Sequence, residues 1–545
     1  MGFDTGAGGS VPVRHPCVPD LVHQGEVVVD IAKEDLGRKQ MFAIGTCLIE
    51  GGIDPGEGRS GLLLNIGIGI LCDLTREVHD PIVGDDLAGS FSHLLACNRH
   101  GIDPIAIRTG ARAPVLVSST FAWKDLPPMP FTPELLTAIR DRFHHTDVCP
   151  IQGPRAFFEN AGGSLTLKSA VECTAELMAF PDNQGRSNVA SRYLMDVIAQ
   201  GRADMMLALG ASRGEVFVGE TGTELLGRLI RNAVLASGGS VVIGSHLEHP
   251  ATYSACRRWA PVAGMTYEQV GFDTDTTVVS VEQYRPVLTP DLAVATIIHA
   301  SPVTGMHVDV AAIAAEIRAV APDCFIIVDG IQHAAHGRVD IDDYGVDGYV
   351  VSGYKFFSRH NFGVAWVSDR LANAPHDQLD GAASNVWELG TRDASAYAAF
   401  SAVVRYLEWL GAEVGDPEAP SRARIEAAAA AIGEQEQDLV DAMMWGTGGL
   451  PGLGQLDKVQ VIGPTNSEHR SGMVSFLIEG HDSLDVVDAL NADGVRTHAR
   501  KRDYYSAGVL DPLGIENCVR ASASHYNTRA EVEQMLATVN RLAGS

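Results

Sequence analysis

The chain is sparing in cysteine, and its cysteines form no recognisable motif. Nine cysteines are scattered over 545 residues, with no CxxC pair and no dense framework of the kind that stabilises small secreted domains. Residues 1–30 also lack a basic segment followed by an apolar run, the pattern of a secretory signal. Both absences indicate a reducing compartment, and we predict a cytoplasmic protein.

Long apolar runs and clusters of basic residues are missing as well. The most apolar stretch, residues 61–71, is shorter than the roughly 20 residues that cross a bilayer, and we expect it to form a buried strand. The formal net charge of -27 opposes binding to nucleic acid or to an anionic membrane, because phosphate contacts need clustered Lys and Arg. We therefore predict a soluble protein with neither of these partners.

The length and composition predict a globular protein of several domains. Hydrophobic residues make up 46% and charged residues 20% of the chain, which argues against long disordered regions. The proline-rich segment Asp125–Pro130 cannot lie inside a helix or a central strand, so we interpret it as a linker. We predict an N-terminal domain of unknown function at 1–130, a large domain at 131–395 and a small C-terminal domain at 396–545.

Residues 131–395 show the pattern of an α/β domain. From Thr132 to about residue 370, short apolar runs alternate with amphipathic helix patterns, which indicates a mostly parallel sheet flanked by helices. A long helix is expected over 394–411. The rest of the chain predicts a small α+β domain, with strands at 458–462, 472–478, near Arg496 and at 519–524, and helices from Arg424, at 483–491 and from Arg529.

Polar residues stand at the ends of two successive apolar runs between Cys324 and Phe357. The first run ends at Asp329, and the second is followed by Lys355. Ligands of open α/β sheets bind beyond the carboxyl ends of the strands. The pair suits pyridoxal 5'-phosphate (PLP), because the lysine holds the cofactor as a Schiff base and the acid keeps its pyridine nitrogen protonated. A helix-capping aspartate and a solvated lysine are the alternatives, which the joint placement disfavours.

A phosphate cradle is expected at the start of another helix. The apolar run that ends at Val218 is followed by a helix pattern beginning near Thr221. The first-turn amides of that helix, the hydroxyls of Thr221 and Thr223, and the close approach permitted by Gly222 suit a phosphate group. A strand, a turn and a helix with glycine is a common pattern, so this signal gains weight only from its neighbours.

Three further polar positions lie at or near strand ends. His249 would stack on a planar ring or move protons, although a lone histidine is more often structural. Gln332 is placed to donate a hydrogen bond to the oxygen of the cofactor ring. The turn at 301–305 is a candidate for the wall of the pocket.

At these residues the sequence resembles a known superfamily. VDGIQHAAHG at 328–337, followed by GVDGYVVSGYKFF at 345–357, is similar to the class V aminotransferase superfamily, and within it to the cysteine desulfurase-like proteins. The resemblance runs from about Phe131 to the C-terminus. Further matching segments are FFENAGG at 157–163, SHLEHPATYSA at 245–255, HASPVTG at 299–305, WELGTRD at 387–393 and VRASASHYNT at 519–528.

The resemblance implies a PLP-dependent enzyme of fold type I with an extra N-terminal domain. Lys355 would bind the cofactor covalently, and Asp329 would pair with the pyridine nitrogen. His249 would stack on the ring, and Gln332 would contact its phenolic oxygen. Five residues would surround the phosphate: Thr221, Gly222, Thr223, Ser352 and Tyr354.

The resemblance also implies a substrate site and a second subunit. Arg520 would bind the α-carboxylate of an amino acid, for which the fixed fork of a guanidinium is suited. Thr391 and Arg496 match positions that help to complete the neighbouring subunit's site in such proteins. A homodimer with shared active sites is therefore expected.

The chain departs from the desulfurases at the position of the sulfur-accepting cysteine. Those enzymes need a nucleophilic cysteine on the loop after Arg496, and here residues 496–508 read RTHARKRDYYSAG. Cys518 follows in an apparent strand, where we expect a small buried hydrophobic residue. Pro302 stands where desulfurases usually have asparagine, so one polar contact near the ring is lost or replaced.

Two groups of residues allow two interpretations each. Lys501, Arg502, Asp503 and Tyr505 contact the distal part of the substrate or form a solvated loop face. His93, Cys97 and His100 fall on one face of an expected helix and would bind zinc if a fourth ligand were present. Because leucines are interleaved and no fourth ligand is visible, we favour a packed helix without metal.

These observations predict a PLP-dependent enzyme that acts on an amino acid or an amine. We rank a lyase first, one that eliminates a group from the β-carbon by breaking a carbon–sulfur or similar bond without a persulfide cysteine. A class V aminotransferase, an epimerase and a cysteine desulfurase are the enzymatic alternatives. A non-catalytic binding or scaffold protein on a degenerate PLP fold is the alternative of another class.

Overall fold

In this computed structural model of the protein, the described residues are 51–53, 60–62, 105–107, 115–117, 131–466 and 469–544. The chain divides into two compact units, one formed by residues 20–128 and the other including residues 129–545. In the first unit, β1 (Gly51–Ile53) pairs antiparallel with β2 (Ser60–Leu62), and β3 (Ile105–Ile107) pairs antiparallel with β4 (Val115–Val117). Residues 63–71 of the expected buried strand, and His93, Cys97 and His100, lie outside the described residues.

A seven-stranded sheet forms the centre of the second unit. Its neighbouring strands are parallel except at β14, which runs antiparallel to both of its neighbours. The mostly parallel α/β sheet of a fold type I enzyme is therefore confirmed. In spatial order the strands are β10 (Thr266–Val270), β9 (Val241–Ser245), β11 (Leu292–Ile298), β12 (Phe325–Asp329), β13 (Gly348–Ser352), β14 (Gly363–Val367) and β8 (Glu215–Gly219).

The strands at the centre of this sheet are buried on both faces. In β12, Phe325 and Ile327 pack into one hydrophobic cluster, whereas Ile326 and Val328 pack into another. Successive side chains of a strand point to opposite faces, so a strand covered on both sides needs an uninterrupted apolar run. Asp329 is the last residue of β12, which places a carboxyl group at the carboxyl end of an otherwise apolar strand.

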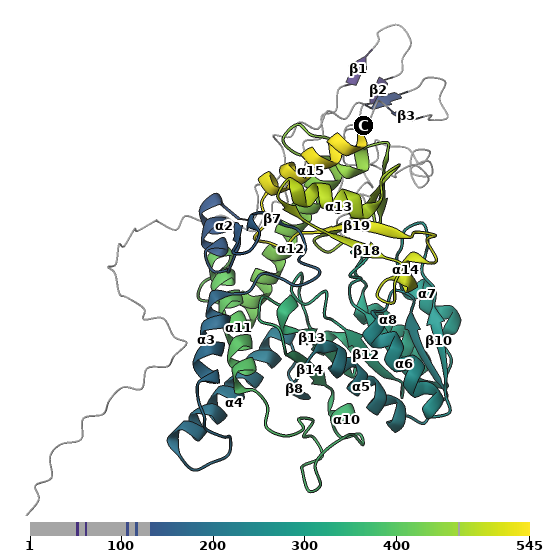
Figure 1. The fold of residues 1–545 in the computed structure, drawn as a ribbon. Coiled ribbons are helices and arrows are strands. Elements are labelled where there is room, and N and C mark those ends of the chain that lie inside the picture. The colour runs from purple at the N-terminus through teal and green to yellow at the C-terminus, as the bar shows by residue number, and fades with distance from the viewer. Residues whose placement is uncertain are drawn as a thin grey trace, which may run out of the picture. The chain divides into compact units, whose positions relative to one another are not determined.

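Helices cover both faces of the sheet (Figure 1). One cluster contains side chains of α5 (Gly222–Ala236) and α6 (Pro250–Val262), and the other contains side chains from the remaining large helices. These are α3 (Lys168–Met178), α4 (Val189–Leu209), α8 (Val310–Val320), α11 (Ala394–Val414) and the N-terminal half of α12 (Ser421–Trp445). Shorter helices are α2 (Pro133–Arg140), α7 (Val281–Tyr284), α9 (Ile341–Tyr344) and α10 (Asp369–Ala372).

The C-terminal part forms the small α+β domain that the sequence predicts. Its four-stranded antiparallel sheet has the order β15 (Val459–Ile462), β16 (Met473–Ile478), β19 (Asn517–Ser522) and β18 (His498–Lys501). Side chains of three helices share one apolar cluster with this sheet. They belong to α12 (Ser421–Trp445), α13 (Ser483–Ala492) and α15 (Arg529–Ala543), and α14 (Ala507–Leu510) lies in the loop after β18.

Several element boundaries differ from the sequence-based expectation. The helix expected over 394–411 extends to Val414, and the strand expected over 519–524 spans Asn517–Ser522. The alanine-rich helix begins at Ser421 and not at Arg424, because Pro420 serves as its N-cap residue and needs no N–H there. The strand near Arg496 is two short strands, β17 (Val495–Arg496) and β18, because the chain changes partner at Thr497. β17 pairs with β7 (Ala156–Phe157), which fastens the start of the large domain to the small one.

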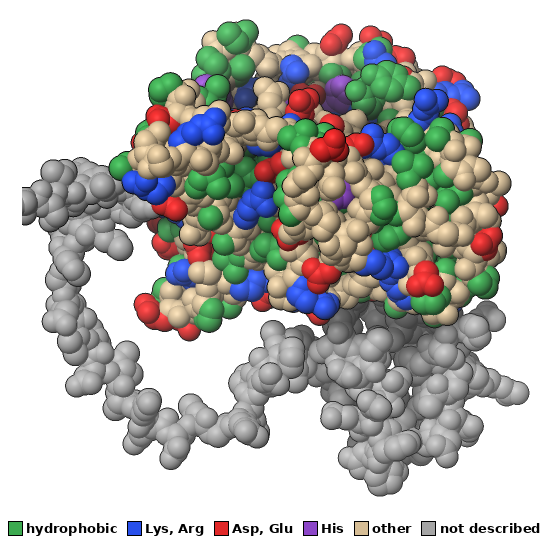
Figure 2. All heavy atoms as spheres, turned by 90° about the horizontal axis from the view of Figure 1, so that it is seen from below, with side chains coloured by type: hydrophobic (Ala, Val, Ile, Leu, Met, Phe, Trp, Pro, Cys, Tyr) green, Lys and Arg blue, Asp and Glu red, His purple; other side chains and the backbone are tan. Residues whose placement is uncertain are grey.

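The surface of the described part mixes side chains of all kinds. On the face in Figure 2, acidic, basic and apolar groups are interspersed. Among the helices of the described residues, none has the length and the apolar character that crossing a membrane requires.

Candidate active site

Asp329 and Lys355 come from adjacent strands and face one cavity. β12 pairs in parallel with β13, and Lys355 lies in the short turn Gly353–Lys355 after the end of β13. The lysine Nζ donates a hydrogen bond to Oε1 of Gln332 at 2.9 Å. The Asp329 carboxyl oxygens accept hydrogen bonds from the backbone N–H of Ile331 at 3.1 Å and from the hydroxyl of Thr252 at 3.5 Å.

The two groups have pKa values displaced toward neutrality. Burial raises the pKa of Asp329 to about 6, and the Ile331 N–H and the charge of Lys355 oppose that change. Burial, with the charge of Arg520, lowers the pKa of Lys355 to about 7, while Asp329 opposes it. A buried carboxyl group whose hydrogen-bond donors are uncharged has room for a cationic N–H, which a protonated pyridine nitrogen supplies.

The N-terminus of α5 forms the opposite wall of the cavity. Thr221 is the N-cap residue, and its Oγ1 accepts from the N–H of Glu224 at 3.0 Å. Its O–H remains able to donate. A Cβ on Gly222 would lie 2.5 Å from the Ser352 Oγ and 2.5 Å from Ile331 Cδ1. Any larger residue would require these side chains or the helix to move, because the helix closely approaches the end of β13 here.

The cavity brings together most of the residues selected from the sequence. Together with its open mouth, it contains about 550 Å³ of space that protein atoms do not fill. Its lining includes Thr221, Gly222, Thr223, His249, Pro302, Asp329, Gln332, Ser352, Tyr354 and Lys355. The N-terminus of α5 would hold the phosphate and Asp329 would pair with the pyridine nitrogen, so the residues fit PLP.

His249 is held as a neutral ring. It is the N-cap residue of α6, and its Nδ1 accepts from the N–H of Ala251 at 3.1 Å. Burial, with the charges of Lys355 and Arg500, lowers its pKa to about 3. Because Nδ1 is an acceptor, the ring proton lies on Nε2. The geometry favours stacking and hydrogen-bond donation over removal of a proton.

Arg520 offers unused donors beside the cavity. It lies in β19, is 2% exposed, and donates through Nη1 to the carbonyl of Pro302 at 2.8 Å. Its buried Nε has no hydrogen-bond partner among the described residues. Burial and the charge of Arg500 lower its pKa to about 9, so it stays cationic at neutral pH. A buried guanidinium with an unpaired N–H suits a carboxylate ligand. Pro302 lacks an N–H, but its carbonyl orients this arginine.

The two residues assigned to the neighbouring subunit lie outside the cavity lining. Thr391 is exposed. Arg496 donates through Nε to Glu159 at 2.8 Å, and its side chain is 45% exposed. Their roles in a shared site stay predictions.

The end of β18 and the loop that follows it separate into an inner and an outer part. Arg502 forms exposed ion pairs with Asp511 and Glu516, and Lys501 is exposed. Asp503 accepts from the N–H of Tyr505 at 2.9 Å. The ring of Tyr505 lies 6.0 Å from that of His249, between centroids. Of the four candidates on this loop, Tyr505 is thus the one with a contact to a residue of the cavity.

Sequence reasoning missed Arg500. In the β18–β19 pairing, Arg500 lies opposite Cys518 and His498 lies opposite Arg520, so all four side chains share one face of the sheet. Its Nε donates to the Ser506 hydroxyl at 2.8 Å. After burial and Arg520, its positive charge also contributes to the lowered pKa of Lys355. The alternation of His498 and Arg500 in the sequence indicates a strand. Without the register of that strand with its neighbour, it does not show which face of the sheet the two side chains occupy.

Sequence reasoning also missed a buried acid behind Asp329. Glu248 is 3% exposed, and its Oε1 accepts from the N–H of Ile298 at 2.9 Å. Burial and the charge of Asp329 raise its pKa to about 8. Glu248 directly precedes His249, the residue expected to stack on the cofactor ring. The sequence signal for Glu248 was an acidic residue within a segment that packs into the core.

The fold and the cavity define a PLP-dependent enzyme of fold type I. A family model described as aminotransferase class-V matches residues 156–535. The chain therefore belongs to the class V aminotransferase family, and its cofactor is pyridoxal 5'-phosphate.

Curated relatives point to the same family. A probable cysteine desulfurase of Mycobacterium leprae is 26% identical over 64% of this chain and 81% of its own length. The cysteine desulfurase-like protein ustD of Aspergillus flavus is 26% identical over 72% of this chain and 88% of its own. The aminotransferase-like protein FGM3 of Gibberella zeae is 25% identical over 70% of this chain and 92% of its own.

Solved structures share the fold. The cysteine desulfurase of Thermococcus onnurineus superposes with a TM-score of 0.61 at 21% identity, over 72% of this chain and 95% of that chain. The cysteine desulfurase CsdA of Escherichia coli gives a TM-score of 0.60 at 19% identity, over 74% of this chain and 98% of that chain. At these identities the likeness concerns the fold alone.

Proposed function

We propose that the protein is a PLP-dependent lyase that breaks a bond at the β-carbon of an amino acid, such as a carbon–sulfur bond, without a persulfide cysteine. The observation that carries the proposal is a cavity whose lining suits PLP and whose His249 lies near Tyr505, in the segment 497–508 that contains no cysteine. Cys518 is buried in β19, and burial raises its pKa to about 11. A thiol with so little thiolate at neutral pH is a poor sulfur acceptor.

Three residues would prepare the substrate. The free donors of Arg520 would bind the α-carboxylate and fix the amino acid above the cavity. When bound, the cofactor withdraws electron density from the α-carbon and so eases loss of its proton. Asp329 would sustain that withdrawal by keeping the pyridine nitrogen protonated. Lys355, whose pKa is lowered to about 7, has a neutral amine available near neutral pH to take the α-proton.

Elimination follows from that proton transfer. The electron pair of the broken C–H bond forms the double bond between the α- and β-carbons, and the leaving group departs from the β-carbon with its bonding pair. Water then releases the nitrogen as ammonia and the carbon skeleton as a 2-oxo acid. The cationic Arg500, on the same sheet face as Arg520, is suited to stabilise negative charge on the departing group.

The proposal is tested with the purified, PLP-loaded protein and a panel of β-substituted amino acids, including L-cysteine, an S-alkyl-L-cysteine and O-acetyl-L-serine. We expect a 2-oxo acid and ammonia in equal amounts, and none with Lys355→Ala. Accumulation of pyridoxamine 5'-phosphate without ammonia would identify an aminotransferase, and inversion of the α-carbon would identify an epimerase. If the wild-type protein has no PLP absorbance band that is lost in Lys355→Ala, the protein is a scaffold and the lyase proposal fails.

We also propose that the enzyme is a homodimer with shared active sites. Met178 at the end of α3 is 71% exposed and Val189 at the start of α4 is 72% exposed. In the connection between these two helices, Gln184 donates to the carbonyl of Arg392 at 2.9 Å, so this connection lies beside the segment that contains Thr391. Exposed apolar groups next to a residue assigned to a neighbour's site support a subunit contact there.

The proposed domain limits remain 1–130, 131–395 and 396–545. The cytoplasmic location stays a prediction.

A further inference from the structure

A chain of buried polar side chains leads from Lys355 to the small domain. Lys355 Nζ lies 2.9 Å from Gln332 Oε1, and Gln332 Nε2 lies 3.5 Å from His336 Nε2. His336 Nδ1 lies 2.8 Å from Glu436 Oε2 on α12. The side chains of His336 and Glu436 are 7% and 3% exposed. Lys355 and Gln332 line the cavity, and His336 and Glu436 lie buried behind them, so the four groups form a connected path out of the cavity.

Each hydrogen bond of this path has a fixed direction. A lysine amine or ammonium donates, so the Gln332 oxygen faces Lys355 and the amide nitrogen faces His336. Because an amide nitrogen only donates, His336 Nε2 must accept. The proton of the neutral ring is then on Nδ1 and points to the Glu436 carboxylate. The acceptor at Glu436 thus determines which way the Gln332 amide is turned.

Glu436 is not explained by a contribution to the stability of the fold. Its Oε1 is buried and has no hydrogen-bond partner among the described residues. Burying a carboxylate with one oxygen unsatisfied costs stability that an apolar residue at this point of α12 would not cost. The loss of stability is explained if Glu436 orients a group in the active site.

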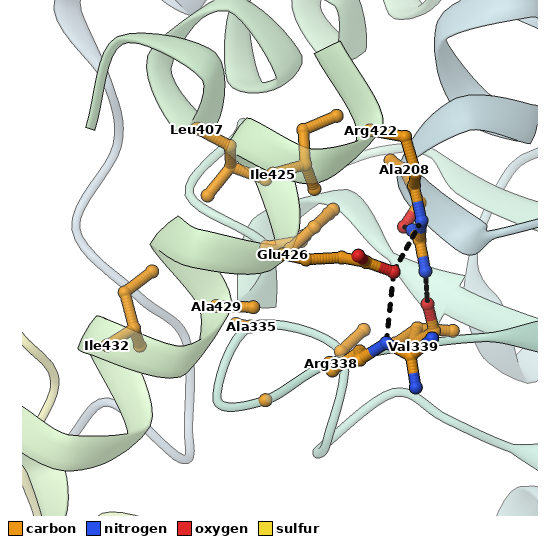
Figure 3. Close-up of a pocket in the computed structure, with 13 residues that line it drawn as sticks. Ala208, Ala335, Arg338, Val339, Leu407, Arg422, Ile425, Glu426, Ala429 and Ile432 are labelled. Carbon is orange, nitrogen blue, oxygen red and sulfur yellow. Dashed lines mark hydrogen bonds and ion pairs between the residues drawn. The ribbon is translucent and has the colours of Figure 1, made fainter. Parts of the chain in front are cut away.

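The same face of α12 holds the rest of the loop that carries Gln332. Arg422 donates to the carbonyl of Val339 at 2.7 Å, and Glu426 pairs with Arg338 at 3.0 Å. Figure 3 shows these contacts at one side of a small cavity lined by α12 and by the loop. The loop is therefore fastened to α12 at 338–339 and again at His336.

We propose that Glu436 is a positioning residue of the active site, which acts through His336 to fix the direction of the Gln332 amide and thereby the place of the Lys355 amine. It touches neither cofactor nor substrate. With its oxygen toward Lys355 and one N–H toward His336, the amide keeps a second N–H for the ring oxygen of the cofactor. The inference depends on PLP and Lys355 and not on which reaction follows.

The test measures Lys355 in the full-length protein freed of its cofactor. Only the neutral amine attacks the aldehyde of added PLP, so the rate of covalent attachment, followed by absorbance, rises with pH and has its midpoint at the pKa of Lys355. Glu436→Ala lets the amide turn and removes the acceptor that favours the charged lysine. We expect its midpoint to fall by about 0.5 to 1 pH unit. Glu434→Ala, an exposed position on the same helix, should leave the midpoint unchanged.

A conservative variant separates hydrogen bonding from charge. Glu436→Gln keeps an oxygen acceptor for His336 and should retain the wild-type midpoint. If Glu436→Gln lowers the midpoint as far as Glu436→Ala does, the effect follows the charge of Glu436 and the proposal is overturned. The proposal is also overturned if Glu436→Ala leaves the midpoint unchanged. Where Glu436→Ala does not fold, His336→Phe keeps the ring volume without the acceptor and should give the same downward shift. Substrate is absent, so the lyase proposal can fail independently.

Discussion

Lys355 is a buried amine near the cationic Arg520, and this should be visible in the pH dependence of stability. In the folded chain its pKa is lowered from 10.5 to about 7 by burial first and by Arg520 second. Between these pH values the unfolded chain binds more protons at this group, so its contribution to the free energy of unfolding rises with pH. At pH 7 and below, the buried charge therefore destabilises the cofactor-free protein.

Replacing the amine should remove that cost. Cofactor-free Lys355→Met is expected to be about 2 to 4 kcal/mol more stable than wild type at pH 7. The advantage should shrink as the pH approaches 10. Urea unfolding of both proteins at a series of pH values measures it. An advantage that does not change with pH would show that the lysine is not desolvated as the structure has it.

Arg520 is expected to act on the substrate and not on the cofactor. Arg520→Lys keeps a positive charge but loses the planar fork and the unpaired Nε, so we expect kcat/KM to fall about 100-fold, mostly through KM. The PLP absorbance should stay unchanged. Arg502→Lys is the matched control, because Arg502 is engaged in exposed ion pairs. Equal effects of both variants would contradict the assignment.

At the scale of elements, the helix N-terminus depends on a close approach. Gly222→Ala would place a Cβ 2.5 Å from Ser352 Oγ and 2.5 Å from Ile331 Cδ1, so either these two side chains or the start of α5 must move. We expect the affinity for PLP to fall at least about 10-fold while the fold is kept. Gly227→Ala on the same helix, with nothing within 4 Å of its Cβ, should bind PLP normally. Equilibrium titration of the cofactor-free variants measures both.

The elements that hold the cofactor were predictable from the sequence, whereas two of their supporting residues were not. β12 is an apolar run that ends in Asp329, and Lys355 follows the end of the apolar β13, so local pattern alone identifies both residues. Arg500 acquires its place only through the register of β18 with β19. Glu436 lies 100 residues from His336 in the chain. Register and packing between distant segments leave no local signal.

At the scale of the whole molecule, a shared site predicts complementation between subunits. Lys355→Ala lacks the amine in its own cavity, and Arg496→Ala lacks the arginine that we assign to the partner's site. In a mixed dimer, one cavity carries both defects and the other carries neither. Because about half of the dimers in an equal mixture are mixed, we expect about a quarter of the wild-type activity from two variants that are each nearly inactive.

The measurement requires that the subunits exchange, which co-expression with two affinity tags achieves. The mixed dimer purified through both tags should have about half the wild-type activity per dimer, and light scattering should give twice the chain mass. Arg541→Ala, which removes an exposed ion pair with Asp493, serves as a partner variant that leaves activity intact. If the mixed dimer of Lys355→Ala and Arg496→Ala is inactive, Arg496 works within its own subunit. Its contact with Glu159 at 2.8 Å would then be the relevant one, and the site would be complete in one chain.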